Sequence, residues 1–455
     1  MNTKTLRQKI LDLAIHGKLV PQDPDDEPAS ELLKRIKAEK ERLIKEGKIK
    51  GSKKSAKASD TPHYEQVKLE VPNSWYMVSV SDLFLLNPKS ELDDNMKVGF
   101  IPMALVEDGF SGNHFYEERT WKDVKKGYCH FQNGDIGIAK ISPCFENRKS
   151  TIFKNLPNTY GAGTTELVIL RPIKVYTKFY LYLFKSDWYV KEGTKYFKGV
   201  VGQQRVHKEI FTDLHIPLPP FAEQQRIVEE IEYWFALIDQ IEQSKAALQA
   251  TIAQAKKKIL DLAIHGKLVA QDPDDEPASE LLKRINPQAE QMYEEELPKG
   301  WVMTPMNILC SLVDGEKQSG IERINLDVKY LRGDRRAKKT LSSGKYVAAN
   351  SLLILVDGEN SGEVFRTPIE GYQGSTLKQL FVNANMNIEY VLQVINLHRK
   401  ELRENKVGSA IPHLNKKLFK EIEVPLPPLA EQKRIVKKIE ELFGVLDTIQ
   451  QALEE

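Results

Sequence analysis

The sequence predicts an α+β protein in which two mixed α/β globular domains are separated by two long antiparallel coiled-coil helices, with a pseudo-twofold, cyclic internal repeat. Two repeats and a helical periodicity support this prediction. Residues 9–36 recur at 258–285 with 27 of 28 positions identical, the exception being Pro21 against Ala270. The block IPLPPFAEQQRIVEEIE at 216–232 recurs as VPLPPLAEQKRIVKKIE at 424–440. We call these repeated regions the frame.

The order of the repeats divides the chain into five regions. The first block repeats at an offset of 249 residues and the second at 208, so the two segments between them differ in length. We expect a helical repeat with a Lys-rich linker, a first variable domain, a central helical repeat, a second variable domain and a C-terminal helix, at residues 1–60, 61–215, 216–285, 286–423 and 424–455.

The N-terminal region is expected to be a helix that frays into a flexible linker, because residues 37–60 are Lys-rich and end in Ser, Gly and Ala. The 455-residue chain has no run of about 18 apolar residues, and its N-terminus carries charges where a signal peptide would be apolar. We therefore expect a cytoplasmic protein without membrane contact.

The two variable regions have a mixed, strand-rich pattern. Short apolar runs, LVIL at 167–170 and SLLILV at 351–356, are bounded by Gly, Asp and Asn turns. Each variable region is therefore predicted to form a mixed α/β domain.

The central frame is predicted to be one long helix of about 45 residues, spanning roughly 70 Å. Pro219 and Pro220 suit its start, and Gly266 and Pro273 suit its end. Steps of three and four residues form a heptad seam, which comprises Ile227, Ile231, Trp234, Ile238, Ile241, Leu248, Ile252, Ile259 and Leu262.

A long helix cannot bury such a seam alone, so a partner helix is expected. The C-terminal copy carries apolar residues in the same register from Ile435 to Leu453, and the N-terminal copy continues it with Leu6, Ile10 and Leu13. The partner is therefore predicted to be a second helix, split into two pieces at the chain termini and antiparallel to the first.

Basic residues gather in both variable regions although the whole chain carries a formal charge of only +2. Residues 140–210 hold 13 Lys and Arg against 5 Asp and Glu, and residues 321–345 hold 8 against 3. Basic segments with Gln, Asn, Gly and aromatic residues suit contacts with phosphates and base edges. A solvated lysine-rich face remains the alternative for each cluster.

Four segments are candidates for DNA contact. The segments 198–211 and 405–419 each place a Gly loop and polar residues before a Pro-Leu-Pro-Pro turn, and 134–150 and 330–340 crowd basic residues around a loop or turn. Capping turns that only end a domain would give the first pattern equally well. The candidate residues are Lys140, Arg148, Lys149, Gln203, Gln204, Arg205, His207, Arg332, Arg335, Arg336, Lys338, His413, Asn415 and Lys416.

Signals for catalysis or metal binding are poor. GAGTTE at 161–166 lacks the pattern of a phosphate-binding loop, and no Walker lysine is present. Three separated cysteines have no ligand spacing, and the repeated His16 and His265 suit helix-end contacts. We predict no catalytic residue, no metal site and no cofactor in this chain.

The twofold motif PLPPxAEQxRIVxxIE, the two variable regions and the cyclic register resemble the DNA specificity subunit of type I restriction-modification systems. The resemblance covers nearly the whole chain, although the second variable region lacks a loop like SPCFE at 142–146 and has VDGENSGEVF at 356–365 as its nearest match. It implies a non-catalytic subunit in which each variable region is a target recognition domain for one half of a bipartite, asymmetric DNA site.

The resemblance also implies partners. Two modification subunits that methylate adenine with S-adenosylmethionine would bind the frame, and two restriction subunits using ATP and Mg²⁺ would join them on double-stranded DNA. The residues that match the motif, and are expected to bind partners, are Pro219, Pro220, Glu223, Gln224, Pro427, Pro428, Glu431 and Gln432.

Two other functions remain open at this point. A duplicated protein–protein adaptor or coiled-coil scaffold without DNA sequence readout would explain the repeats and heptads. A single-chain methyltransferase or nuclease is less compatible, since the glycine motif of a cofactor site and an Asn/Asp-Pro-Pro-aromatic motif are missing.

Overall fold

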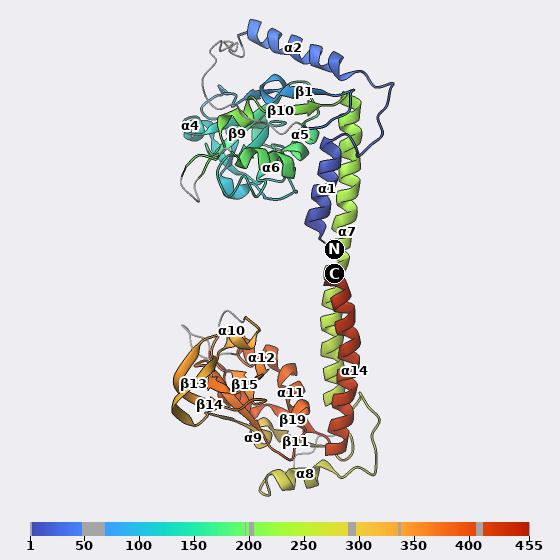
Figure 1. The fold of residues 1–455 in the computed structure, drawn as a ribbon, viewed down its shortest axis with the longest axis vertical. Coiled ribbons are helices and arrows are strands. Elements are labelled where there is room, and N and C mark those ends of the chain that lie inside the picture. The colour runs from blue at the N-terminus through green and yellow to red at the C-terminus, as the bar shows by residue number, and fades with distance from the viewer. Residues whose placement is uncertain are drawn as a thin grey trace. The chain divides into compact units, whose positions relative to one another are not determined.

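The computed structural model describes residues 2–47, 69–195, 197–199, 204–289, 297–334, 338–405 and 413–454. The chain divides into two compact units, residues 1–243 (unit one) and 244–455 (unit two). Each unit combines one mixed domain with helices of the frame (Figure 1). Among the described residues, no helix has the length and apolar character needed to cross a membrane.

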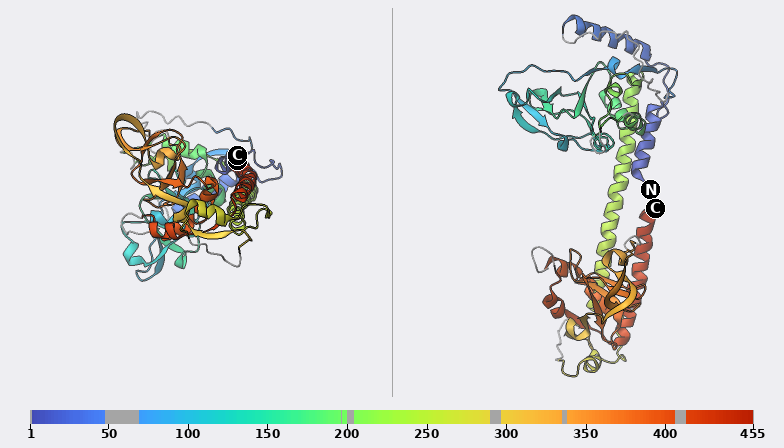
Figure 2. Two further views of the ribbon diagram at one scale, coloured as in Figure 1. Left: turned by 90° about the horizontal axis from the view of Figure 1, so that it is seen from below. Right: turned by 60° about the vertical axis from the view of Figure 1, so that its left-hand side comes forward.

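In unit one, helix α1 (Thr3–Ile15) packs along the first part of helix α7 (Phe221–Ile264), as the right view of Figure 2 shows. The two run antiparallel, because Arg7 contacts Asp239 whereas Gln22, after α1, contacts Glu223. In unit two, helix α14 (Leu429–Glu454) packs antiparallel on the rest of α7. Each unit thus contains part of the continuous helix paired with one of the two shorter pieces, as predicted.

The predicted heptad seam is wrong at Trp234, Ile241 and Leu248, which are exposed. Phe235 is buried in place of Trp234, because the rings of Tyr182 and Phe110 pack against it from the mixed domain. The buried face of helix α7 is therefore set by contacts with the mixed domain as well as with α1. The Trp234 indole instead lies at the surface, where it donates a hydrogen bond to Glu230.

The mixed domain of unit one contains two four-stranded sheets and a two-stranded ribbon that joins it to α7. The ribbon pairs β1 (Tyr76–Ser79) with β10 (His215–Leu218). One sheet has the order β2-β9-β6-β7, with bounds Phe84–Leu86, Leu167–Pro172, Ile136–Ala139 and Ser150–Ile152. The other has the order β4-β3-β8-β5, with bounds Glu117–Thr120, Lys97–Ile101, Tyr160–Gly163 and Cys129–Gln132.

Short helices complete unit one. Helix α2 (Ala29–Lys45) begins within the first repeat and contacts α3. The others are α3 (Val80–Leu83), α4 (Trp121–Val124), α5 (Thr177–Phe184) and α6 (Asp187–Thr194), with 3-10 turns at Met103–Leu105, Pro157–Thr159 and Lys208–Phe211. The main core of the unit joins α1, α5, α6 and α7, so the domain and the frame share one hydrophobic interior.

The mixed domain of unit two repeats this plan with one altered sheet. Its ribbon pairs β11 (Val302–Pro305) with β19 (Glu423–Leu426). The sheet β12-β18-β15-β16 comprises Cys310–Val313, Leu377–Val382, Leu352–Leu355 and Val364–Arg366. A small closed barrel of β13 (Lys317–Leu326), β14 (Thr340–Val347) and β17 (Gly371–Gln373) replaces the second sheet.

The helices of unit two occupy corresponding places in the chain. They are α8 (Ala278–Ile285), α9 (Met306–Leu309), α10 (Val328–Leu331), α11 (Ile388–Leu397), α12 (Arg399–Glu404) and α13 (Lys416–Glu421). Tyr180 on α5 and Tyr390 on α11 each donate their hydroxyl to the carbonyl of a strand proline, Pro217 and Pro425 respectively. The repeat therefore extends into variable regions whose sequences do not reveal it.

A cation at the same register position closes the helix pair in each unit. Arg7 Nη2 lies 2.7 Å from Asp239 Oδ1, and its guanidinium lies 5.0 Å from the centroid of the Phe235 ring. In unit two, Lys256 pairs with Asp447 and lies 5.5 Å from the centroid of the Phe443 ring. Each cation combines an ion pair with an aromatic face, which favours antiparallel pairing in this register.

Unit one has an additional attachment between domain and frame, which we call the brace: Gly109, Phe110, Arg148 and Lys185. The Lys185 ammonium is buried and donates to the carbonyl oxygens of Gly109 (2.8 Å) and Arg148 (3.0 Å). This holds the loop that places Phe110 against Phe235, with ring centroids 5.7 Å apart. Burial, and secondarily the charge of Arg148, lowers the pKa of Lys185 from 10.5 to about 7.

The lowered pKa predicts that unit one becomes more stable as pH rises above 7. Between pH 7 and about 10.5 the unfolded chain binds the lysine proton and the folded chain does not, so the free energy of unfolding increases with pH, by up to about 1.4 kcal/mol per unit. Lys185→Met should flatten this dependence in denaturant unfolding at pH 7, 8 and 9. Lys191→Met, an exposed lysine of α6, is the control and should keep it. If the free energy of unfolding depended on pH equally in all three proteins, the lowered pKa of Lys185 would be contradicted.

Candidate nucleic-acid interface

The two copies of the Pro-Pro-x-Ala-Glu-Gln motif form two equivalent structures, which we call the joints, where a ribbon passes into a long helix. In the first joint, Glu223 accepts hydrogen bonds from Trp75 Nε1 (2.8 Å) and Gln22 Nε2 (2.5 Å). Gln224 accepts from the backbone N–H of Tyr176 and donates to the carbonyl of Pro219, both at 2.9 Å. One buried pair thus connects the N-terminal repeat, the mixed domain and α7.

The second joint repeats these contacts. Glu431 accepts from Trp301 Nε1 (2.9 Å) and Gln271 Nε2 (2.7 Å). Gln432 accepts from the N–H of Asn387 (3.1 Å) and donates to the carbonyl of Pro427 (2.9 Å). Burial raises the pKa of Glu223 and of Glu431 above its ordinary range, and the two hydrogen bonds on each carboxylate oppose that rise.

The residues predicted to bind partners therefore lie inside the chain. All of them are buried, and the Glu and Gln side chains are hydrogen-bonded within their own unit. This set is Pro219, Pro220, Glu223, Gln224, Pro427, Pro428, Glu431 and Gln432. Their direct contact with a partner remains a prediction, whereas their role in attaching each domain to its helix is visible in these contacts.

Two candidate segments of unit one, distant in sequence, meet at the end of strand β6. The N–H of Ser142 donates to the carbonyl of Gln204, and the N–H of Val206 donates to the carbonyl of Lys140, both at 2.8 Å. Arg205, whose exposed guanidinium lies 2.7 Å from Glu166 Oε1, sits between them. Lys140 is half-buried at this edge. The loop after β6 and the segment before β10 therefore form one polar surface.

Arg148 and Lys149 are directed into the protein instead. The Arg148 guanidinium pairs with Asp187 and donates through Nε to the carbonyl of Lys185 (3.0 Å). Lys149 Nζ donates to the carbonyl oxygens of Val106 (2.8 Å) and Met103 (3.3 Å). These two side chains position loops, which leaves less of their hydrogen-bonding capacity for phosphates. His207 lies 3.4 Å from Glu209, and Gln203 lies outside the described residues.

The corresponding surface of unit two forms at the end of strand β15. The N–H of Leu414 donates to the carbonyl of Val356 (2.7 Å), and His413 Nδ1 lies 2.7 Å from Asp357 Oδ1. Glu363 pairs with Arg332 and lies 3.5 Å from Arg399. The two candidate segments of this domain, 330–340 and 405–419, thus each contact the loop 356–365 through Arg332, His413 and Leu414.

The remaining candidates of unit two differ in role. Asn415 caps α13 by accepting from the N–H of Leu418 (3.1 Å), which is a structural function. Lys338 and Lys416 are exposed. Arg335 and Arg336 lie outside the described residues.

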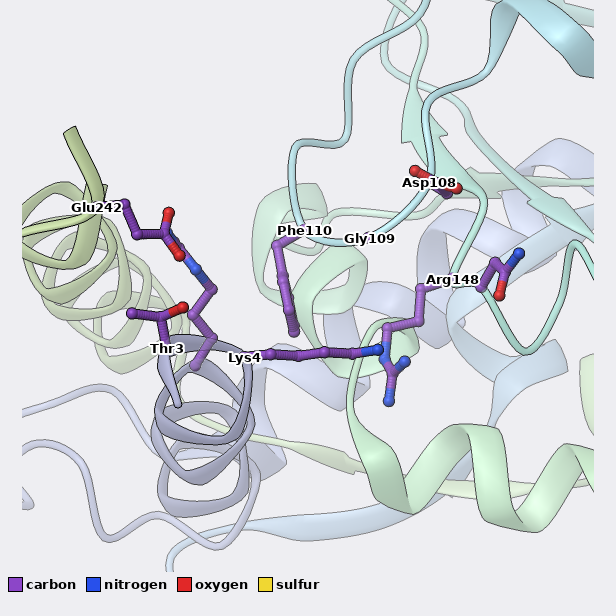
Figure 3. A pocket seen from close by; sticks show the side chains of 9 residues that line it. Thr3, Lys4, Asp108, Gly109, Phe110, Arg148 and Glu242 are labelled. Carbon is purple, nitrogen blue, oxygen red and sulfur yellow. The ribbon is translucent and has the colours of Figure 1, made fainter. Parts of the chain in front are cut away.

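A cavity of about 380 Å³ in unit one lies between α1, α7 and the loops that carry Asp108 and Arg148. Figure 3 shows Lys4, Phe110 and Arg148 converging on it. Its lining combines three cations with the carboxylates of Asp108 and Glu242, so it has no strong preference for an anion. Within the described ranges, no group of three or more His, Cys, Asp or Glu residues could hold a metal ion.

Two of the three cysteines, Cys129 in unit one and Cys310 in unit two, are buried thiols of low reactivity. Burial raises the pKa of Cys129 and of Cys310 to about 12, far above neutral pH. Since the thiolate is the reactive form, neither is suited to act as a nucleophile.

Two variable domains with polar loops, each attached through the same joint to a repeated helical frame, define a duplicated recognition protein. The chain belongs to the type I restriction-modification DNA specificity family, since the family model "Type I restriction modification DNA specificity domain" matches residues 72–250 and 322–455. It is a specificity subunit that recognises a DNA target. The family resemblance and the fold class predicted from the sequence are both confirmed.

The chain is similar along nearly all its length to two relatives from Escherichia coli. The EcoAI specificity subunit is 33% identical, with 97% of this chain and 89% of the relative aligned. The EcoEI specificity subunit is 32% identical, with 99% and 91% aligned. The fold also resembles a chain from a structure of type I R-M complex assembly (18% identity, TM-score 0.60, covering 84% of this chain and 93% of that one). The HsdS subunit from Thermoanaerobacter tengcongensis has 18% identity and a TM-score of 0.51, covering 85% and 93%.

The joints predict a large local loss of stability when their carboxylate is removed. Glu223→Ala leaves Trp75 Nε1 and Gln22 without their acceptor, which should destabilise unit one by roughly 2–4 kcal/mol. Glu431→Ala should do the same to unit two. Glu229→Ala, an exposed glutamate on the same helix, is the matched control and should change stability by less than about 0.5 kcal/mol. Denaturant unfolding followed by tryptophan fluorescence measures this, and a loss no larger than the control's would refute the role of the carboxylate.

Proposed function

We propose that this chain recognises a bipartite, asymmetric DNA site, with the domain of unit one reading one half and the domain of unit two reading the other. The observation that carries the proposal is that two domains with different loops are attached by identical joints. Identical joints keep each domain in the same relation to its own helix, while different loops present different side chains. An asymmetric pair of half-sites is the expected target.

The polar surfaces at the ends of β6 and β15 are the proposed reading surfaces. The candidates proposed to contact DNA are Lys140, Gln204, Arg205 and His207 in unit one and Arg332, Lys338, His413 and Lys416 in unit two, which are all half-buried or exposed. Arg205 forms an ion pair with Glu166, and His413 Nδ1 lies 2.7 Å from Asp357 Oδ1. Those pairs fix the side chains before DNA binds, which reduces the entropy lost on binding.

The chain is proposed to be non-catalytic and to act through partners. Two modification subunits that methylate adenine with S-adenosylmethionine would bind the frame, since a repeated frame offers two identical partners related sites. Two restriction subunits supplied with ATP and Mg²⁺ would complete the complex. The buried joint residues would support this docking indirectly, by holding the exposed helix faces in place. The adaptor alternative is disfavoured because the relatives that align over nearly the whole chain are specificity subunits.

Exchange of one domain tests the division of labour. Replacing residues 286–423 by the corresponding segment of a relative should change one half of the methylated sequence and leave the other half unchanged, because separate domains contribute almost additively. The measurement is methylome sequencing of cells that express the chain with its modification partner. The reciprocal exchange of residues 61–215 is the control and should alter the opposite half. A simultaneous change of both halves would show that the domains read one composite surface.

Lengthening the frame tests its role as a spacer. Seven residues inserted into the exposed middle of α7, near Leu248, add about 10 Å of helix, close to three base pairs of rise. The gap between the two half-sites should widen while the half-sites keep their sequences. A variant in which residues 245–251 are replaced without insertion is the control and should keep the original gap. An unchanged gap in the lengthened protein would contradict the spacer role.

A further inference from the structure

Strands β13 and β14 of unit two form a two-stranded ribbon that lies largely outside the hydrophobic cores. They pair antiparallel from Lys317 opposite Lys345 to Ile324 opposite Thr340, with an irregularity between Ser319 and Arg323. Two apolar side chains are exposed on it, Ile321 (49%) and Leu341 (41%). A two-stranded ribbon is marginally stable in water by itself. This one therefore needs either the rest of the domain packed on one face or a partner bound to the other face.

Support comes from beneath, on one face only. Tyr372 of β17 is fully buried and donates its hydroxyl to the carbonyl of Ile321 (2.7 Å). Gly344 lies so close that a Cβ there would be 2.7 Å from the Tyr372 ring, so this face of β14 admits no side chain at Gly344. The inner face of the ribbon is therefore the one that carries Gly344 and Gln318, its partner in the pairing.

The outer face follows from the alternation of side chains along a strand. Ser343 and Lys345 flank Gly344 and point away from Tyr372, and so do their partners Ser319 and Lys317. Leu341 lies two residues further along on the same face. The outer face thus presents two hydroxyls, an apolar side chain and an exposed ammonium at Lys317.

The ribbon is fixed at both ends of its exposed part. Lys345 lies 2.7 Å from Asp314 Oδ1, and the Arg323 guanidinium lies 4.7 Å from the centroid of the Tyr346 ring while pairing with Glu370. These contacts order an exposed surface before any partner binds. Unit one has no equivalent ribbon among its described residues, because β3 and β4 are five and four residues long against ten and eight here.

The composition of this segment is strongly basic. Residues 317–347 contain nine Lys and Arg against three Asp and Glu. A two-stranded ribbon fits the major groove of B-DNA, about 12 Å wide, where hydroxyls contact base edges and an apolar side chain contacts the thymine methyl group. Three of these cations, Lys317, Arg323 and Lys345, belong to the two strands and the other six to the connecting segment 327–339, so double-stranded DNA is the occupant that the charge and shape favour.

We propose that the β13–β14 ribbon enters the major groove of the half-site read by unit two, with Ser319, Ser343 and Leu341 contacting bases and Lys317 contacting a phosphate. The inference rests on the proposed function and names the element of this domain that determines its sequence preference. The ribbon is then a reading element in addition to the loop surface at the end of β15, and it has no counterpart in the described part of unit one.

The test uses the full chain with its modification partner. The double variant Ser319→Ala and Ser343→Ala should weaken binding to the native site by roughly tenfold or more and relax the methylated sequence within one half-site only. Leu341→Ser should lower the preference for thymine at one position. Lys317→Ala should weaken binding to all sequences alike and reduce the salt dependence. Ser311→Ala, an exposed serine of β12 outside the ribbon, is the matched control.

The outcomes separate this inference from the proposed function. If the unaltered complex methylated no bipartite site, the proposed function would fail. If it methylated such a site and the serine variant kept the affinity and sequence of the Ser311→Ala control, the ribbon assignment would be overturned while the proposed function stood. Loss of partner binding with unchanged DNA affinity would equally overturn it, by assigning the ribbon to a protein partner. Leu341→Ser replaces an exposed side chain, so a folding defect in the double variant leaves a second decisive measurement.

Discussion

The hydrogen bond between a tryptophan indole and a buried glutamate, Trp75 to Glu223 and Trp301 to Glu431, is the contact on which the rest of the structure depends. A carboxylate removed from water is costly unless donors surround it. Here one donor is the Trp indole at the entry to the mixed domain, and the other is the Gln side chain within the repeat. The glutamate is therefore satisfied only when three distant parts of the chain are together, so it couples domain, repeat and long helix in one folding unit.

This constraint explains why variability is confined to the domains. The joint needs a Trp before the first strand of the domain, a Gln within the repeat and a Glu on the long helix, and both units have them in the same places. The domain residues that donate to Gln224 and Gln432 do so through the backbone, from the N–H of Tyr176 and of Asn387. Backbone donors tolerate changes of side chain, so the loops can change without loosening the attachment.

The fold class and the paired helices could be predicted from the sequence, because repeated blocks and apolar spacing can be read directly from the residues. The Pro-Pro-x-Ala-Glu-Gln motif was also identified there as a repeated element. The sequence did not predict that Glu223 and Gln224 are buried, since both residue types are normally exposed and their donors are remote in sequence. The meeting of Ser142 with Gln204 depends on long-range pairing that no local pattern encodes. Lys185 was missed as well, although a lone lysine inside YLYLFKSDWYV was the available signal for a buried cation.

The brace of unit one has a consequence for how such proteins can diversify. Lys185 lies five residues after Tyr180, and the residue five after Tyr390 in unit two is the buried Ile395. A lysine needs the carbonyls of Gly109 and Arg148, which lie in the same exchangeable domain, so these groups are replaced together and the frame keeps Phe235 as a contact point for a new domain. A new first domain must therefore present its own ring to Phe235 or leave that face of α7 uncovered, which limits the domains that the first position can accept.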